Sequence, residues 1–158
     1  MHPAPVISHS NLTRLLLDGD TLSIAAYLPD GQLRNISDSI VSVRSVIEQG
    51  NLTAKQLEVA IERTEEIIMP MLSSLPANTE LEALGATLAD VMHLILETGK
   101  TAAPIQSVEQ LFNQLADHAG GSAIAWRHPV PAQRIATGLV ILREVMFHGG
   151  FSVAHLPR

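Results

Sequence analysis

The sequence predicts an all-α fold: a helical bundle of four or five main helices, with irregular or short β segments near its two ends. Three observations predict it. Hydrophobic residues make up 46% of the 158 residues but aromatic residues only 3%, and an aliphatic core of this kind suits a helical bundle better than a β-sandwich. Apolar residues recur at spacings of three and four along most of the chain. Three capping boxes also stand directly before such apolar runs.

The helical pattern is weakest at the N-terminal end. We expect residues 1–158 to form a single helical domain in which residues 1–9, with two prolines and two histidines, are an irregular arm. Residues 10–28 have two interpretations. Two short helices that break at Asp18-Gly19 are preferred, and the alternative is a β-hairpin that turns at the same place.

The next two helices form a predicted αα-hairpin. The second of them begins with a capping box of Thr53 and Gln56. Pro70 predicts a kink or break near its end, because a proline removes a backbone donor and crowds the carbonyl four residues earlier. The first helix ends at Gly50, and its inward face consists of Ile36, Ile40, Val43 and Ile47.

The segment 81–98 is the best single helix in the sequence, and the rest of the bundle is expected to pack around it. Thr79 and Glu82 form a capping box before it, and Gly99 ends it. We predict that its broad apolar face lies in the core. That face consists of Leu81, Leu84, Leu88, Val91, Met92 and Ile95.

Two further helices and a short strand complete the predicted fold. A third capping box begins at Ser107 and opens a helix that stops at the glycine pair 120–121. Pro131 suits the first turn of the final helix, which ends at the glycine pair 149–150. The tail, residues 151–156, alternates apolar and small or polar residues, which is typical of a short strand.

Charge and composition exclude several functions. The net charge of −6 argues against nucleic acid as a partner, because affinity for phosphate depends largely on Lys and Arg. The absence of cysteine excludes a disulfide framework, a zinc knuckle and a thiol nucleophile. We find neither the pattern of a signal peptide nor an apolar run long enough for a transmembrane helix, so a cytoplasmic location and no membrane partner are expected.

The first candidate site is a metal site on the 81–98 helix. Asp90 and His93 are three residues apart, and a carboxylate with an imidazole at that spacing resembles half of the di-metal motif of helical bundles. The second helix would add carboxylates from Glu62 and Glu66, and the final helix would add His148. A divalent metal is therefore the one cofactor that the sequence suggests. The competing interpretation is a solvated polar stripe.

Glu144 and His148 are the nearest substitute for a second half of that motif, but they are four residues apart. Glu65, one residue before Glu66, also belongs to the acidic row of the second helix. A histidine at a helix C-terminus is stabilised by the helix dipole, and a glutamate one turn earlier adds to this effect. The pair therefore has a structural explanation that involves no chemistry.

The second candidate site is a loop flanked by prolines. Trp126, Arg127 and His128 offer an aromatic plane, a guanidinium and an imidazole, and Arg134 follows just inside the final helix. A rigid loop of this composition suits a small anion or a partner protein. In the alternative interpretation Trp126 plugs the end of the bundle while its polar neighbours lie in water.

Functionally, the sequence favours a non-catalytic interaction, accessory or regulatory protein that acts as a homo-oligomer. No known catalytic motif is present, and only 16% of the residues are charged, which leaves little charge to solvate a monomer. The expected partner is a second copy or another protein. Two alternatives stay open: a metal-dependent helical-bundle enzyme or metal binder that uses Asp90 and His93 with the carboxylates of the second helix, and a small-ligand sensor.

Overall fold

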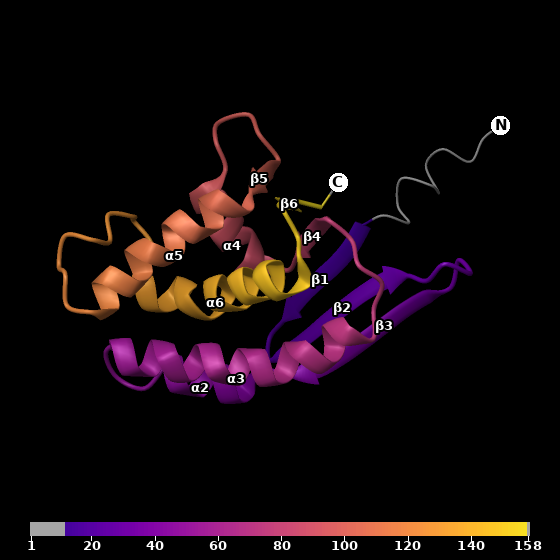
Figure 1. The fold of residues 1–158 in the computed structure, drawn as a ribbon. Coiled ribbons are helices and arrows are strands. Elements are labelled where there is room, and N and C mark those ends of the chain that lie inside the picture. The colour runs from indigo at the N-terminus through magenta and orange to yellow at the C-terminus, as the bar shows by residue number, and fades with distance from the viewer. Residues whose placement is uncertain (1–11, 158) are drawn as a thin grey trace.

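The computed structural model describes residues 12–157, which form a mixed α/β structure and not an all-α bundle, so the predicted fold class is wrong (Figure 1). The predicted arm, residues 1–9, lies outside the described residues. The strands are β1 (Leu12–Asp18), β2 (Thr21–Tyr27), β3 (Leu33–Ser39), β4 (Glu80–Leu84), β5 (Ala102–Pro104) and β6 (Val153–His155). The helices are α2 (Val41–Ile47), α3 (Ala54–Ser73), α4 (Ala86–Ile95), α5 (Ile105–Ala119) and α6 (Ala132–Gly149).

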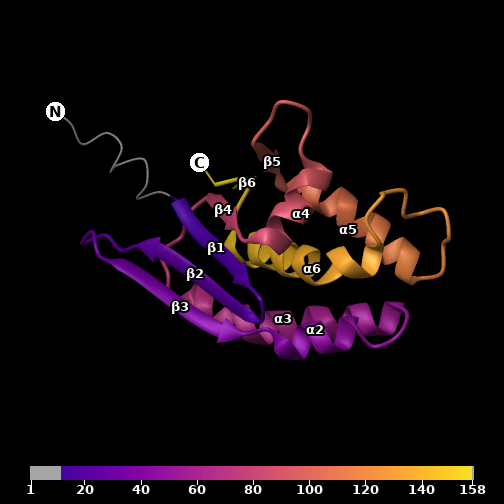
Figure 2. The same ribbon diagram turned by 180° about the vertical axis from the view of Figure 1, so that it is seen from behind.

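The strands of the described residues form one six-stranded sheet in the order β3-β2-β1-β4-β6-β5. β2 is antiparallel to both β1 and β3, and β5 is antiparallel to β6. β1, β4 and β6 run parallel to one another. The helices gather beside the sheet, with α6 between α3 and α5 (Figures 1 and 2). Because β1 and β4 are parallel neighbours, their carboxyl ends meet at the same edge of the sheet.

The preferred prediction of two short helices at residues 10–28 is wrong, and the β-hairpin alternative is correct. β1 and β2 pair around a turn at Gly19. Alternation between core and surface is the pattern of a strand with one buried face. It is hidden in the sequence because the other face also carries apolar residues, such as Leu16 and Ala25, which resemble a helical pattern over a few residues. The buried residues that alternate are Thr13, Leu15, Leu17, Leu22, Ile24 and Ala26.

The first helix of the predicted αα-hairpin is a strand followed by a shorter helix. Ile36 lies in β3, and α2 begins only at Val41. The apolar spacing of the two elements coincides with a helical period because β3 is an edge strand that is mostly exposed and so has few buried residues to reveal its alternation. Val43 and Ile47 do lie in the core, as the predicted face requires.

Helix α3 confirms the second half of that prediction. The backbone N–H of Gln56 donates to Oγ1 of Thr53 at 3.2 Å, and the N–H of Thr53 donates to Oε1 of Gln56 at 2.8 Å, so the capping box is formed. The helix does not break at Pro70 but continues to Ser73. Proline so near the end of a helix interrupts only the last turns.

The predicted helix at 81–98 is a strand, a glycine and a shorter helix. Gly85 has a φ of 102°, far from helical values, so no helix can pass through it. Glu82 lies in β4, and the predicted capping box with Thr79 is therefore not formed. The predicted apolar face nevertheless contributes to the core, because β4 and α4, on either side of Gly85, both direct apolar side chains inward. Its fully buried residues are Leu81, Leu88, Val91 and Met92.

The last two helices agree well with the sequence. α5 begins at Ile105, so Ser107 lies inside the helix and the predicted capping box is not formed; the N-cap is Pro104, without a side-chain hydrogen bond. α6 begins directly after Pro131 and ends at Gly149, as predicted. The tail forms the short strand β6, which inserts between β4 and β5.

Helix α6 is the centre of the core. It contacts α2, α3, α4 and α5, and most of its side chains are buried. Gly138 lets α4 approach closely, because a Cβ there would lie 2.9 Å from Cγ2 of Thr87 and 3.1 Å from Cγ2 of Val91. Among residues 12–157, no helix is both long enough and apolar enough to cross a membrane.

Gly85 carries a strong steric constraint that a substitution can test. A Cβ on Gly85 would lie 2.2 Å from the carbonyl oxygen of Leu17 in β1, and the residue also has a positive φ. Gly85→Ala is therefore expected to lower the free energy of unfolding by roughly 3 kcal/mol in urea denaturation. Gly99 also has a positive φ but open space around it, so Gly99→Ala should cost only about 1 kcal/mol. Equal losses would contradict the close approach.

Candidate functional site

The structure does not gather the predicted metal ligands. Asp90 and His93 are exposed on α4, and Glu62 and Glu66 are exposed on α3. His148 is half-buried near the C-terminal end of α6. Of these five residues, only His148 belongs to a group of three ligand-type side chains that the described residues bring together.

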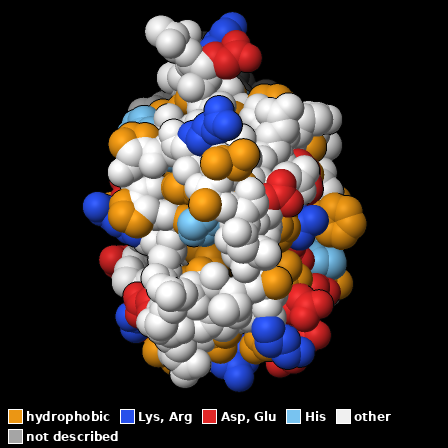
Figure 3. Space-filling model, turned by 90° about the vertical axis from the view of Figure 1, so that its left-hand side faces the viewer, with side chains coloured by type: hydrophobic (Ala, Val, Ile, Leu, Met, Phe, Trp, Pro, Cys, Tyr) orange, Lys and Arg blue, Asp and Glu red, His pale blue; other side chains and the backbone are white. Residues whose placement is uncertain are grey.

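The proline-flanked loop between α5 and α6 is held by its own contacts, by a hydrogen bond of 2.7 Å between His128 and Gln114 of α5, and by packing of Trp126 against the core. Nε1 of Trp126 donates to the carbonyl oxygen of Val130 at 2.7 Å, and the indole ring packs edge-to-face against His128 at 4.7 Å. Arg127 and Arg134 are exposed. Figure 3 views the end of the molecule that carries this loop: charges of both signs and separate hydrophobic side chains are scattered over it. The structure leaves the binding role predicted for these residues as a prediction.

A site of different geometry lies at the sheet edge where β1 and β4 end. Leu16 of β1 pairs with Leu84 of β4, so Asp18, at the end of β1, and Gly85, directly after β4, lie at the same edge. Crevices beyond the carboxyl ends of parallel strands are the usual ligand sites of open α/β sheets. Asp18, the last residue of β1, is exposed.

Arg44 fixes the turn that follows β1. Its Nη2 donates to Oδ2 of Asp20 at 2.6 Å, its Nε contacts the other carboxylate oxygen, and its Nη1 donates to Glu48 at 3.1 Å. Hydrogen bonding and charge from Asp20 raise the pKa of the Arg44 guanidinium above its usual value. The paired Asp20 is therefore a structural residue that ties the turn to α2, whereas Asp18 points its charge to solvent.

The N-terminus of α4 faces the same edge without a side-chain cap. Its N-cap is Gly85, which has no side chain to accept a hydrogen bond. The first backbone N–H groups of a helix have no partner inside the helix, and together with the helix dipole they attract anions. Ala86 is exposed and Thr87 half-exposed, so the helix begins at the surface. This edge can bind an anion, and Asp18 can hold a cation beside it.

Reasoning from the sequence missed this edge because it drew one helix across residues 81–98. A helix N-terminus at residue 86 cannot be recognised when residues 81–98 are taken as one continuous helix. Gly85, a helix breaker inside an otherwise apolar run, was the available indication.

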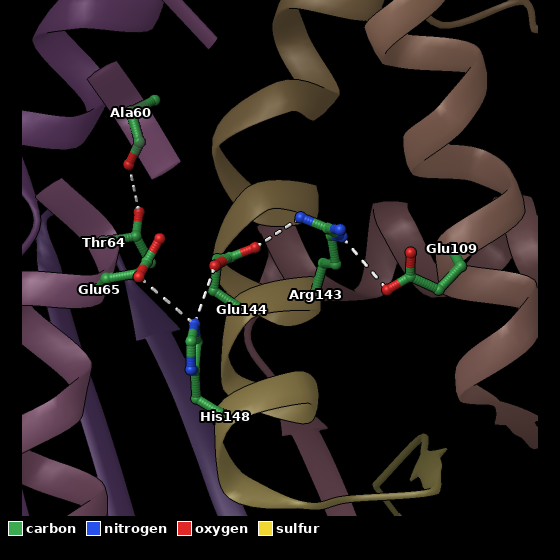
Figure 4. A network of polar contacts seen from close by, with 7 residues as sticks. All are labelled: Ala60, Thr64, Glu65, Glu109, Arg143, Glu144 and His148. Atoms are coloured by element: carbon green, nitrogen blue, oxygen red, sulfur yellow. Dashed lines mark hydrogen bonds and ion pairs between the residues drawn. The ribbon is translucent and has the colours of Figure 1, made fainter. Parts of the chain in front are cut away.

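A second polar cluster joins α3, α5 and α6 (Figure 4). Nε2 of His148 lies 3.2 Å from Oε1 of Glu144 and 3.7 Å from Oε2 of Glu65. Nη1 of Arg143 donates to Oε2 of Glu144 at 2.8 Å. Nε of Arg143 donates to Oε1 of Glu109 at 3.2 Å, which connects the cluster to α5.

Glu144 is the most unusual member of this cluster, since its side chain is only 3% exposed. Burial raises the pKa of Glu144 above its ordinary 4.5, and the negative charge of Glu65 acts in the same direction. The positive charges of Arg143 and His148 oppose this shift. The sequence showed the Glu144–His148 spacing, but only the packing of α3 against α6 adds Glu65.

Comparison with known proteins identifies the fold. No family model matches the chain, and no curated protein matches its sequence. Solved structures do match. An exopolyphosphatase-like protein superposes with a TM-score of 0.70 at 14% identity, covering 94% of this chain and 54% of that one. The Aquifex aeolicus PPX-GPPA enzyme gives 0.63 at 14% identity, covering 92% and 52%. An exopolyphosphatase from Cytophaga hutchinsonii gives 0.65 at 12% identity, covering 94% and 53%.

At such low identity these matches show a shared fold, which is that of Ppx/GppA phosphatases, and the chain spans about half the length of each matched structure. They overturn the prediction of a non-catalytic helical accessory protein, because the fold belongs to structures named as phosphatases and is not a helical bundle. The metal-bundle and ligand-sensor alternatives fit no better. The prediction relied on helical spacing and on the lack of a catalytic motif, and neither detects a site built from strand ends.

The raised pKa of Glu144 predicts a pH dependence of stability. Between pH 4.5 and the raised value, the folded protein binds a proton on Glu144 that the unfolded chain releases, so this residue stabilises the fold less as the pH rises. Glu144→Gln removes that titration. The free energy of unfolding of the wild type relative to Glu144→Gln should therefore fall from pH 4.5 upward in urea denaturation. Glu62→Gln, an exposed site on α3, is the control and should keep the wild-type slope.

Proposed function

We propose that this chain is a lobe of a phosphohydrolase that binds a phosphoryl group of a phosphoric ester or anhydride at the carboxyl edge of β1 and β4. The observation that carries the proposal is the position of Gly85, which sets the uncapped N-terminus of α4 directly against β1. The likeness to Ppx/GppA phosphatases, over 92% or more of the chain, supports the reaction class.

The chemistry of this edge suits a phosphoryl group. Phosphoryl transfer depends mainly on positioning and on neutralising the charge of the equatorial oxygens. The backbone N–H groups of Ala86 and Thr87 would bind those oxygens without a lysine or arginine. Asp18 would hold a Mg²⁺ ion that bridges to the phosphate, since Mg²⁺ commonly uses one or two carboxylates together with substrate oxygens. Arg44 and Asp20 would keep the turn rigid beneath it.

The edge is open on its outer side, whereas phosphoryl transfer needs a site that excludes bulk water. The proposal therefore includes a homo-oligomer in which another copy of this chain covers the open side of the site. The low content of charged residues, 16%, supports such self-association because it leaves surface that is easily desolvated. The proposal also keeps the cytoplasmic location expected from the sequence.

Binding of tripolyphosphate in the presence of Mg²⁺ tests the proposal. Titration of the isotope-labelled chain should shift the amide resonances of residues 85–88, which include the proposed donors Ala86 and Thr87, and those of residues 18–20, which surround the proposed cation ligand Asp18. Asp18→Asn should weaken binding roughly tenfold, as expected for the loss of one metal-bridging carboxylate worth about 1.4 kcal/mol. Release of inorganic phosphate from the same compound measures the hydrolysis.

The matched control is Asp117→Asn, which removes another exposed aspartate, on α5, and should leave binding unchanged. Shifts confined to other residues, or equal affinity in the two variants, would refute a phosphate site at this edge.

A further inference from the structure

The geometry points to a binding site for one divalent metal ion of the zinc and manganese class, formed by Glu65 on α3 with Glu144 and His148 on α6. It is separate from the proposed phosphate site. His148 borders the same hollow as Thr13 at the start of β1, whereas the phosphate edge lies beyond Asp18. Thr13 and Asp18 are five residues apart along β1, which corresponds to roughly 16 Å.

Two of the three distances between donor atoms are close to the spacing that a metal requires. Two ligand atoms that each lie about 2.1 Å from a tetrahedral ion are about 3.4 Å apart. Nε2 of His148 is 3.2 Å from Oε1 of Glu144 and 3.7 Å from Oε2 of Glu65, which brackets that value. One donor atom from each residue lies within 4.8 Å of the others. Only small side-chain movements are therefore needed to enclose an ion.

The carboxylate of Glu144 is oriented for this role. Its Oε2 accepts from Arg143 at 2.8 Å, and this leaves Oε1 to face His148 (Figure 4). Arg143 is in turn held by Glu109 at 3.2 Å and lies over the ring of Phe112 at 4.1 Å. Groups that orient a ligand in this way commonly decide the affinity of a metal site. The guanidinium of Arg143 binds Oε2 of Glu144, which is not one of the three atoms that would bind the metal.

A hollow in the surface borders the histidine of this cluster. His148 lines a hollow of about 250 Å³ together with Thr13, Ser73 and Phe151. A metal centre with three protein ligands commonly completes its coordination with water. Glu65 is half-exposed and gives the ion a path from the surface.

The donor set selects the class of ion. An imidazole nitrogen favours zinc and other transition metals, whereas Ca²⁺ and Mg²⁺ prefer oxygen ligands alone. Carboxylates are ligands of both Zn²⁺ and Mn²⁺, and Zn²⁺ is expected to bind more tightly. A competing explanation needs no metal: a protonated His148 would bridge the two carboxylates as an ion pair. That arrangement predicts no stoichiometric metal binding, so the two explanations can be separated.

Calorimetric titration of the untagged chain with ZnCl₂ and MnCl₂ tests the inference. We expect one equivalent of either ion to bind, with MgCl₂ at least tenfold weaker. A hundredfold excess over Kd should raise Tm by roughly 5 to 10 °C. The electron paramagnetic resonance spectrum of bound Mn²⁺ gives a second readout that does not depend on stability.

Paired variants locate the ion. Glu65→Gln and His148→Ala should each weaken Zn²⁺ binding at least tenfold, whereas Glu62→Gln and His93→Ala change the same residue types at exposed positions and should not. If His148→Ala does not fold, Glu65→Gln alone tests the location of the metal site, because Glu65 lies at the edge of the site. Absence of stoichiometric binding, or equal binding by Glu65→Gln and Glu62→Gln, would overturn the inference. Neither result bears on tripolyphosphate binding at residues 18–20 and 85–88.

Discussion

The close contact between Gly85 and the backbone of Leu17 is the constraint on which the rest of this structure depends. It holds α4 against β1 at a distance that no other residue type permits. Gly85 also separates β4 from α4, because its φ of 102° belongs to neither a strand nor a helix. The uncapped helix N-terminus and the end of β1 thereby reach one edge of the sheet. The proposed phosphate site is a consequence of backbone packing and requires few special side chains.

Helix α6 connects this edge to the other polar feature of the molecule. Its buried face fills the space between α3, α4 and α5, and its last turns carry Glu144 and His148. A buried carboxylate is costly unless it is paired, and Arg143 and His148 provide the pairing. The cluster therefore joins α3, α5 and α6 through ion pairs near the C-terminal end of α6.

Much of the core could be predicted from the sequence, although the fold class could not. The apolar residues Leu88, Val91 and Met92 are buried as predicted, and the boundaries of α6 agree closely. Periodicity identifies which residues avoid water, and this holds whether a strand or a helix carries them. It fails on short segments, where a strand, a turn and a helix in succession imitate one longer helix, as happens across Gly85.

By itself the sequence determined the aliphatic core, the capping box of α3, the end of α6 and the spacing of Glu144 with His148. These are local properties, since each depends on residues within one or two turns of helix. Only the tertiary structure decided between the hairpin and the two short helices that the sequence left open for residues 12–27, placed β4 beside β1, and brought Glu65 to His148 across two helices. The physical reason is that strand pairing and helix packing join residues far apart in the chain, and no local pattern specifies their partners.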